Sequence, residues 1–446
     1  MDGPDRGEGA RGRAAAAPGY AGYEPLSPGT VAARIDRYPG VRERLGGGPG
    51  DWSAREVGDG NLNFVYIVEG PEGSVCVKQA LPYVRLVGES WPLPLSRSFF
   101  EAEALAREAE DAGSVPALLH VDGPQALIVM ENLGAHVVWR KALVARRRHE
   151  AAAPVLGRFL AETLFRSSDL ALDAATRKRE TALFAANTAL LRITEDLVFT
   201  DPYREHPLNR WTSPDLDADA ARVRGDVEWK VAVQGLKHAF LTRAEALIHG
   251  DLHTGSVMVS DDGDVRVIDP EFAFYGPMGF DVGALLANLW INAFAQDGHG
   301  EGAAPFQDWV LEQAQVVWDT FAARFAELWR TERTGDAWPR TLFEDQGQPS
   351  DAALAALLAR VQTDALGFAG AKMARRILGL AGVADLETIE PPGLRAACER
   401  GALAMARALV VEREAIATVA AAGERACAIL SGAADGSGRP AMGDTA

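Results

Sequence analysis

The segment that decides the fold reads His249-Gly-Asp-Leu-His-Thr-Gly-Ser256, and a predicted β-hairpin over residues 256–268 follows it at once. An Asp-Gly turn at residues 262–263 separates two short β-like runs, which is a frequent hairpin connection. Because a hairpin reverses the chain, Asp251 before its first strand and Asp269 after its second can end near each other. The sequence therefore predicts two carboxylates at one end of a hairpin.

Length and composition narrow the class of protein. A chain of 446 residues exceeds what one hydrophobic core usually serves, so we expect two lobes with a ligand-binding cleft between them. The net charge of -17 argues against a nucleic-acid partner. No run reaches the ~18 apolar residues of a membrane helix, so no membrane partner is expected. The three scattered cysteines, Cys76, Cys398 and Cys427, predict no disulfide framework or zinc site and fit a reducing cytoplasm.

The pattern along the chain changes character once. Residues 1–27 and 431–446 lack apolar periodicity and are predicted to be a flexible extension and a flexible tail. Residues 28–130 hold β-like runs and one helical stretch, whereas residues 131–430 are mainly helical. The predicted fold class is α+β, with an N-terminal antiparallel β-sheet lobe that includes a helix and a larger helical C-terminal lobe.

The carboxylates around the hairpin have the types that phosphoryl transfer needs. Asp251 lies in a polar loop after an apolar run, where it can accept the proton of an attacking hydroxyl. Asp269 and Glu271 are two residues apart, and in extended backbone they would project to the same side as oxygen ligands for Mg²⁺. These residues predict ATP-dependent phosphorylation of a hydroxyl group.

The first lobe offers candidate nucleotide contacts. Gly58-Asp-Gly-Asn-Leu-Asn63 precedes a β-like run, so Gly58 and Gly60 can let backbone N–H groups approach phosphates. Lys78 ends an alternating strand and faces away from the predicted core. Glu101 or Glu103 in the following helix could orient its ammonium group, and the sequence does not choose between them.

The boundary between the two patterns is the predicted hinge. Residues 126–129 form a β-like run, and Glu131, Asn132 and Leu133 come directly after it. The backbone of these three residues could hydrogen-bond the adenine base.

These motifs resemble those of the S-methyl-5-thioribose kinases, relatives of the aminoglycoside and choline kinases in the protein-kinase-like superfamily. The superfamily carries the motif HGDxHxxN and a later D-x-D. In this chain Ser256 replaces the final Asn of the first motif and Asp269-Pro-Glu271 replaces the second, which resembles the methylthioribose kinases. The resemblance spans about residues 30 to 420. The matching blocks are Gly58-Asp-Gly-Asn-Leu-Asn63, Lys78-Gln-Ala-Leu-Pro-Tyr83, Val87-Gly-Glu-Ser-Trp-Pro-Leu93, Asp269-Pro-Glu-Phe-Ala-Phe-Tyr-Gly-Pro-Met-Gly-Phe-Asp281, and Ala374-Arg-Arg-Ile377 with Val383-Ala-Asp-Leu386.

The resemblance implies a two-lobed kinase-like fold that binds ATP between its lobes, with Asn61 and Lys78 in contact with the nucleotide. It implies a hinge at residues 131–133, and Mg-ATP held by Asp269 and Glu271. It also implies that the chain is a homodimer.

On the acceptor side, the resemblance implies that Asp251 meets the sugar hydroxyl and that at least one of Arg375 and Arg376 binds the sugar or the transferred phosphoryl group. This arginine pair interrupts an apolar helix, although a pair that snorkels to the surface would give the same pattern. Trp91 lies in a loop expected near the site, or packed beneath that loop. Asp281 is expected to steady the catalytic loop.

The implied reaction converts ATP and S-methyl-5-thioribose to ADP and S-methyl-5-thioribose 1-phosphate, a step of methionine salvage. One alternative is a related kinase for an aminoglycoside, choline or homoserine. Another is a nucleotide-binding pseudokinase, although such a regulator has no need to keep Lys78, Asp251, Asp269 and Glu271 together. His253 is expected to make a structural hydrogen bond, and Gly382 stands where the family is expected to carry a histidine.

Overall fold

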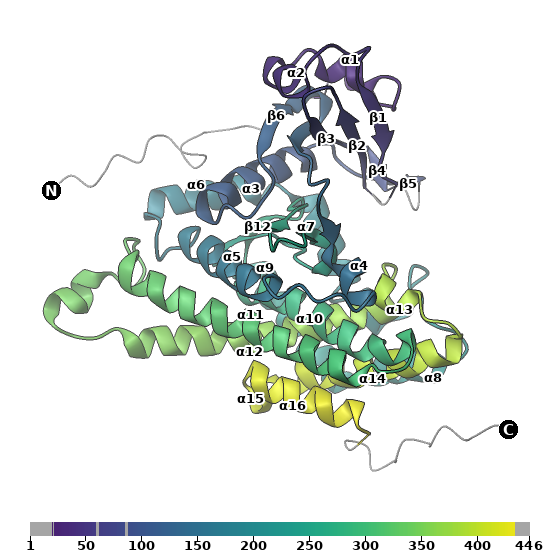
Figure 1. Ribbon diagram of the computed structural model, residues 1–446. Helices are drawn as coiled ribbons and strands as arrows, with labels where there is room; N and C mark the ends of the chain where they lie inside the picture. Colours follow the sequence, from purple (N-terminus) through teal and green to yellow (C-terminus); the bar gives the residue numbers. More distant parts are fainter. Residues whose placement is uncertain (1–19, 21, 59–61, 85–87, 433–446) are drawn as a thin grey trace.

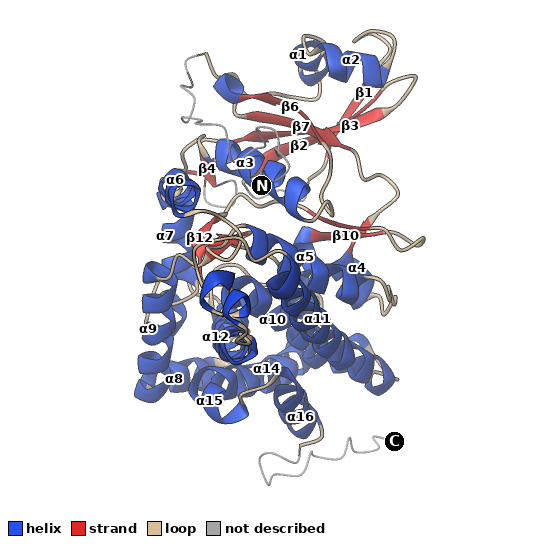
Figure 2. Cartoon of the chain, turned by 90° about the vertical axis from the view of Figure 1, so that its left-hand side faces the viewer, coloured by secondary structure: helices blue, strands red, loops and turns tan. Residues whose placement is uncertain are grey.

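The computed structural model describes residues 20, 22–58, 62–84 and 88–432, and they form two lobes (Figure 1). A β-sheet with short helices lies at one end of the molecule, and a larger group of helices lies at the other (Figure 2). This is the two-lobed α+β architecture predicted from the sequence.

The N-terminal lobe is built on an antiparallel sheet. In the described part of the chain this sheet has five strands in the order β1-β2-β3-β7-β6. Its strands are β1 (Ser53–Glu56), β2 (Asn63–Glu69), β3 (Ser74–Ala80), β6 (Leu118–Asp122) and β7 (Leu127–Glu131), and a separate pair is β4 (Tyr83–Val84) with β5 (Gly88–Pro92). The lobe's helices are α1 (Val31–Ile35), α2 (Pro39–Leu45) and α3 (Arg97–Asp111).

The two faces of β3 have different environments. Val75 and Val77 pack in the core beneath α1 and α2, together with Val31 and Leu45. Because side chains alternate along a strand, Lys78 points to the other face, where α3 lies. The predicted orientation of Lys78 is therefore confirmed.

Part of the predicted N-terminal extension is attached to this lobe. The Leu26 backbone N–H donates to Gln79 Oε1 at 2.8 Å, and the Tyr23 hydroxyl donates to the Ala80 carbonyl at 2.8 Å. These bonds tie residues 22–27 to the end of β3, where the sequence alone predicted a flexible segment. The first 19 residues and residues 433–446 lie outside the described part.

The C-terminal lobe is mainly helical. Its α-helices are α4 (Trp139–Val144), α5 (Ala152–Arg166), α6 (Ala174–Phe184), α7 (Thr188–Leu197), α8 (Asp217–Gly225), α9 (Val227–Thr242), α10 (Gly279–Ala295), α11 (Ala304–Thr331), α12 (Asp351–Leu378), α13 (Ala384–Glu387), α14 (Pro392–Val411), α15 (Arg413–Ile416) and α16 (Val419–Leu430). The apolar stripes of the sequence fall in α5, α10 and α11, as predicted.

Helix α10 is the centre of this lobe, since every residue from Gly279 to Ala295 is buried. It packs closely on α12 because Gly283 has no side chain, and a Cβ there would overlap the Ala365 carbonyl. This close approach brings the C-terminal half of α12 beside the loop 249–256, where Lys372 meets Asp251.

Helix α12 is also long and apolar enough to cross a membrane by length and composition, with 44% of its most apolar window buried in the protein. Its second half, from Asp364 to Leu378, is buried throughout, as in a core helix.

The predicted hairpin is present as β10 (Val257–Val259) paired antiparallel with β11 (Val265–Val267), and β8 (Val137–Val138) joins it. A second antiparallel pair flanks the hairpin in the sequence, since β9 (Ala246–Ile248) precedes it and β12 (Phe274–Gly276) follows it. The loops 249–256 and 268–273 therefore each connect these two small sheets.

Candidate active site

The loop 249–256, which contains Asp251, is held in place by Asp281 of α10. Its carboxylate accepts the His249 N–H at 2.6 Å and the Gly250 N–H at 3.0 Å. Gly250 has φ +84°, and a Cβ at this position would overlap the carbonyl of Phe272. The loop is thus held rigidly against the segment that follows β11, which is the scaffolding role expected for Asp281.

Asp251 lies in this loop with both carboxylate oxygens near cationic or polar groups. Lys372 Nζ of α12 lies 2.7 Å from Oδ1, and His253 Nε2 lies 3.4 Å from Oδ2. Burial alone would raise the pKa of Asp251, but Lys372, His253 and Arg376 hold it well below its ordinary value. The carboxylate is therefore ionised and oriented.

His253 is a neutral, structural imidazole. Its Nδ1 accepts the Gly255 N–H at 3.0 Å, which leaves the ring proton on Nε2, the atom that faces Asp251. Burial, assisted by the positive charges of Arg140 and Arg376, lowers the pKa of His253 to about 3. His253 therefore uses both ring nitrogens in contacts within the loop rather than as a base.

Arg375 and Arg376 lie in the same buried region. Their relative exposures are 9% and 8%, so they do not snorkel to the surface. Among the described residues, no hydrogen-bond partner meets Arg375 Nε, Arg375 Nη1 or Arg376 Nε. Since buried guanidinium groups are normally paired, these donors suit an anionic ligand.

Lys78 lies where the N-terminal lobe meets the segment after β11. Its Nζ lies 2.7 Å from Glu101 Oε1 and 2.7 Å from Asp269 Oδ1, so it links the N-terminal lobe to the segment after β11. Glu103 instead pairs with Arg107 at 2.8 Å. The structure thus resolves the choice that the sequence left open, in favour of Glu101.

Asp269 and Glu271 do not share the extended geometry expected from their spacing. Asp269 has φ +67°, a left-handed conformation, and Glu271 begins a turn. Glu271 Oε2 accepts from Asn63 Nδ2 at 3.2 Å and lies 3.4 Å from Arg97 Nε. The expectation of two parallel side chains in an extended segment was wrong, because the backbone turns sharply at Asp269 and each carboxylate meets different partners.

These two carboxylates nevertheless suit a magnesium ion that also binds phosphates. The Asp269 side chain is 48% exposed and open to a ligand, and Lys78 lowers the pKa of this carboxyl against the effect of burial. Within the described residues, no group of three or more His, Cys, Asp or Glu side chains could hold a metal ion by itself. Mg²⁺ commonly uses one or two carboxylates together with substrate phosphates, so this donor set fits it.

The remaining residues predicted for the site are Gly58, Gly60, Asn61 and Trp91. Gly58 precedes β2, whereas Gly60 and Asn61 lie outside the described residues. Trp91 of β5 packs in a small apolar cluster with Leu93 and Leu190, to which Phe272 of the loop after β11 also belongs.

The hinge residues connect the lobes at the end of β7. The Glu131 N–H donates to the Ala117 carbonyl at 2.9 Å, and Asn132 Nδ2 donates to Ser74 Oγ at 2.9 Å. The Leu133 carbonyl accepts the His136 N–H at 2.9 Å. These bonds anchor the connection that the sequence predicted as the hinge.

Two cleft residues were missed by sequence reasoning. Lys372 lies three and four positions before the arginine pair, and this helical spacing could have indicated it. Arg140 of α4 contacts Asn288 Oδ1 at 2.9 Å and Asp385 Oδ2 at 3.3 Å. Its partners come from distant segments, and no local pattern signals such contacts.

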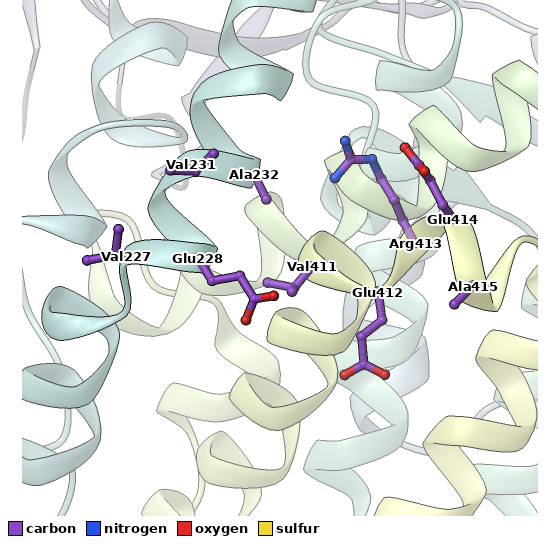
Figure 3. A pocket seen from close by; sticks show the side chains of 9 residues that line it. All are labelled: Val227, Glu228, Val231, Ala232, Val411, Glu412, Arg413, Glu414 and Ala415. Atoms are coloured by element: carbon purple, nitrogen blue, oxygen red, sulfur yellow. The ribbon is translucent and has the colours of Figure 1, made fainter.

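A surface hollow of about 660 Å³ lies between α9 and the α14–α15 junction (Figure 3). Its lining includes Val227, Val231 and Arg413, and it shares no residue with the cleft described above.

Comparison with known proteins gives consistent relatives. The model of the phosphotransferase enzyme family matches residues 53–311. A methylthioribose kinase of Escherichia coli O45:K1 (strain S88 / ExPEC) is 44% identical over 395 residues, which cover 87% of this chain and 94% of that protein. Methylthioribose kinase 2 of Oryza sativa subsp. japonica is 43% identical over 403 residues, or 88% and 93% of the two chains. A solved structure of a choline/ethanolamine kinase family protein from Mesorhizobium loti is 16% identical and covers 89% of this chain and 99% of that chain, with a TM-score of 0.41.

Proposed function

The chain belongs to the methylthioribose kinases within the phosphotransferase enzyme family, and we propose that it transfers the γ-phosphoryl group of ATP to the 1-hydroxyl of S-methyl-5-thioribose through Asp251. The observation that carries the residue assignment is the position of the Asp251 carboxylate, which lies 2.7 Å from Lys372 Nζ and shares a buried region with two arginines whose donors lack partners among the described residues.

On the nucleotide side, Lys78 binds the α and β phosphates, with Glu101 holding its ammonium group in place. The backbone of residues 131–133 receives the adenine, and Gly58, Gly60 and Asn61 are further proposed contacts of the nucleotide. Asp269 and Glu271 would hold Mg²⁺, which would supply positive charge to neutralise that of the phosphates.

On the acceptor side, Asp251 orients the sugar hydroxyl and takes its proton as the new oxygen–phosphorus bond forms and the bond to the β-phosphate oxygen breaks. ADP leaves with that bridging oxygen. Arg375 and Arg376 stabilise the negative charge on the transferred group, and Trp91 borders the sugar.

The cellular setting follows from the family. The product belongs to methionine salvage, and we propose a cytoplasmic homodimer. The three cysteines of the chain, which are free where the structure describes them, support a reducing compartment.

The test is an acceptor panel with the full-length protein and Mg-ATP. Methylthioribose should stimulate ADP release, and ³¹P NMR should detect a sugar 1-phosphate. Preferential turnover of choline, homoserine or an aminoglycoside would replace the substrate. Nucleotide binding without turnover on any acceptor would favour a pseudokinase, which the identity to methylthioribose kinases does not favour.

A further inference from the structure

Lys372 is a buried cation whose position is explained by Asp251. It is 3% exposed, and its Nζ has two notable neighbours, Asp251 Oδ1 at 2.7 Å and the ring of Phe280, whose centroid is 4.8 Å away. The aromatic face stabilises the ammonium group from one side while the carboxylate accepts a hydrogen bond on the other. The side chain is therefore fixed with one charge directed at the catalytic loop.

The two carboxylate oxygens of Asp251 therefore have different neighbours. Oδ1 is engaged by Lys372 at hydrogen-bond distance, whereas within the described part of the chain the contact of Oδ2 is the longer 3.4 Å approach of His253 Nε2. A hydroxyl that needs an acceptor would meet Oδ2, because Oδ1 already serves a strong charge-assisted bond.

We propose that Lys372 is a positioning residue for the phosphoryl transfer, which pins Asp251 Oδ1 so that Oδ2 faces the sugar hydroxyl and keeps the carboxylate anionic in its buried setting. This inference rests on the proposed function. Lys372 acts through Asp251 and is not assigned a contact with substrate.

The surrounding charges support this assignment. The charged and titratable groups around the pair are His253, Asp281, Arg140, Arg375 and Arg376, and the His249 ring accepts the Asp251 N–H at 3.3 Å. Burial lowers the pKa of Lys372 to about 8, even though Asp251 opposes that shift, and the nearby arginines add to it. The pair is therefore kept together in a region with excess positive charge.

The decisive experiment compares Lys372→Met and Lys372→Arg with wild type by the pH dependence of kcat/KM for methylthioribose at saturating Mg-ATP. In Lys372→Met the cation that opposes the effect of burial on Asp251 is lost, so the pKa of Asp251 rises. The acidic limb of the profile, where kcat/KM falls at low pH, should therefore move upward by about 1 to 3 pH units. At pH 7 kcat falls about 10- to 100-fold from lost orientation, while KM for ATP stays within about twofold. Loss of the Lys372 proton is expected to lower wild-type kcat/KM above about pH 8, whereas Lys372→Arg should retain the acidic limb and show no such decline, since arginine stays charged.

Lys237→Met is the matched control, because Lys237 bonds Thr200 Oγ1 at 2.9 Å and has no contact with the cleft described here. It should leave both limbs unchanged. Thermal melting separates loss of folding from loss of positioning, and Lys372→Met combined with Asp251→Asn should recover stability lost by Lys372→Met.

An acidic limb that is unmoved in a folded Lys372→Met protein would overturn the role of Lys372 while leaving the proposed function intact. If wild type does not turn over methylthioribose, the proposed function fails, and the pairing is tested without activity. ¹³C NMR of aspartate-labelled protein, assigned with Asp251→Asn, should then still show the Asp251 pKa raised in Lys372→Met. An unchanged carboxyl pKa would refute the pairing itself.

Discussion

Replacing Lys78 with methionine should destabilise the chain in a strongly pH-dependent way. Glu101 is 1% exposed and Lys78 is 5% exposed, so the ammonium is the buried counter-charge of Glu101. Asp269, the second partner of Lys78, has a side chain that is 48% exposed and can be hydrated when the lysine is removed. The cost of the substitution therefore falls mainly on Glu101.

The magnitude follows from this geometry. Removing one partner of a buried ion pair costs about 3–5 kcal/mol, because the other charge remains buried without compensation. Burial already raises the pKa of Glu101 to about 7 with Lys78 present, and loss of Lys78 raises it further. Protonation of Glu101 thus stabilises the folded chain at low pH, and this stabilisation is lost as the pH rises. The full penalty is expected at pH 8, and less than half of it at pH 5.5.

Urea unfolding at these two pH values measures the difference in free energy between wild type and Lys78→Met. Adding Glu101→Gln to Lys78→Met should recover most of the loss at pH 8, since it removes the uncompensated charge, but should not restore turnover. Lys237→Met again serves as the control lysine substitution. An equal penalty at both pH values, or a double variant as unstable as the single one, would refute this account of the pair.

Three further substitutions probe the acceptor side. Arg375→Met should raise KM for the sugar or lower kcat about 10- to 100-fold in steady-state assays without lowering the melting temperature, because two buried donors of the lost guanidinium have no partner among the described residues. A lower melting temperature with normal kinetics would contradict this. Gly255→Ala should lower kcat and leave the ATP affinity measured by calorimetry unchanged, since the added Cβ would lie 2.7 Å from Arg140 Nη1 and 2.9 Å from His253 Cε1. A normal kcat would show that these side chains move aside without a loss of activity. Asp281→Asn should lower the free energy of unfolding by about 1–3 kcal/mol, because one of two buried backbone N–H groups loses its acceptor. An unchanged midpoint of urea unfolding would refute the scaffolding role of Asp281.

The local features of the fold were predictable because they depend on neighbours in the chain. The Asp-Gly hairpin, the alternation that directs Lys78 away from Val77 and the helix α3 all follow from periods of two and 3.6 residues. The lobes themselves follow from the change of pattern near residue 130.

The site was predictable only in part, since its geometry depends on long-range packing. The choice of Glu101 over Glu103 depends on how α3 is rotated against the sheet, which its own sequence does not specify. The positive φ of Asp269 defeated the assumption of extended backbone. Lys372 reaches Asp251 only because α10 and α12 pack closely enough at Gly283.

The central claim is most directly tested by ADP release from Mg-ATP and methylthioribose, measured for wild type and Asp251→Asn at pH 7.5. Asparagine preserves shape but cannot take the hydroxyl proton, so kcat should fall about 10²- to 10⁴-fold while ATP affinity changes little. The stability lost because Lys372 stays buried without its counter-charge is measured separately by thermal melting. Turnover by Asp251→Asn within a few-fold of wild type would contradict the assignment of Asp251.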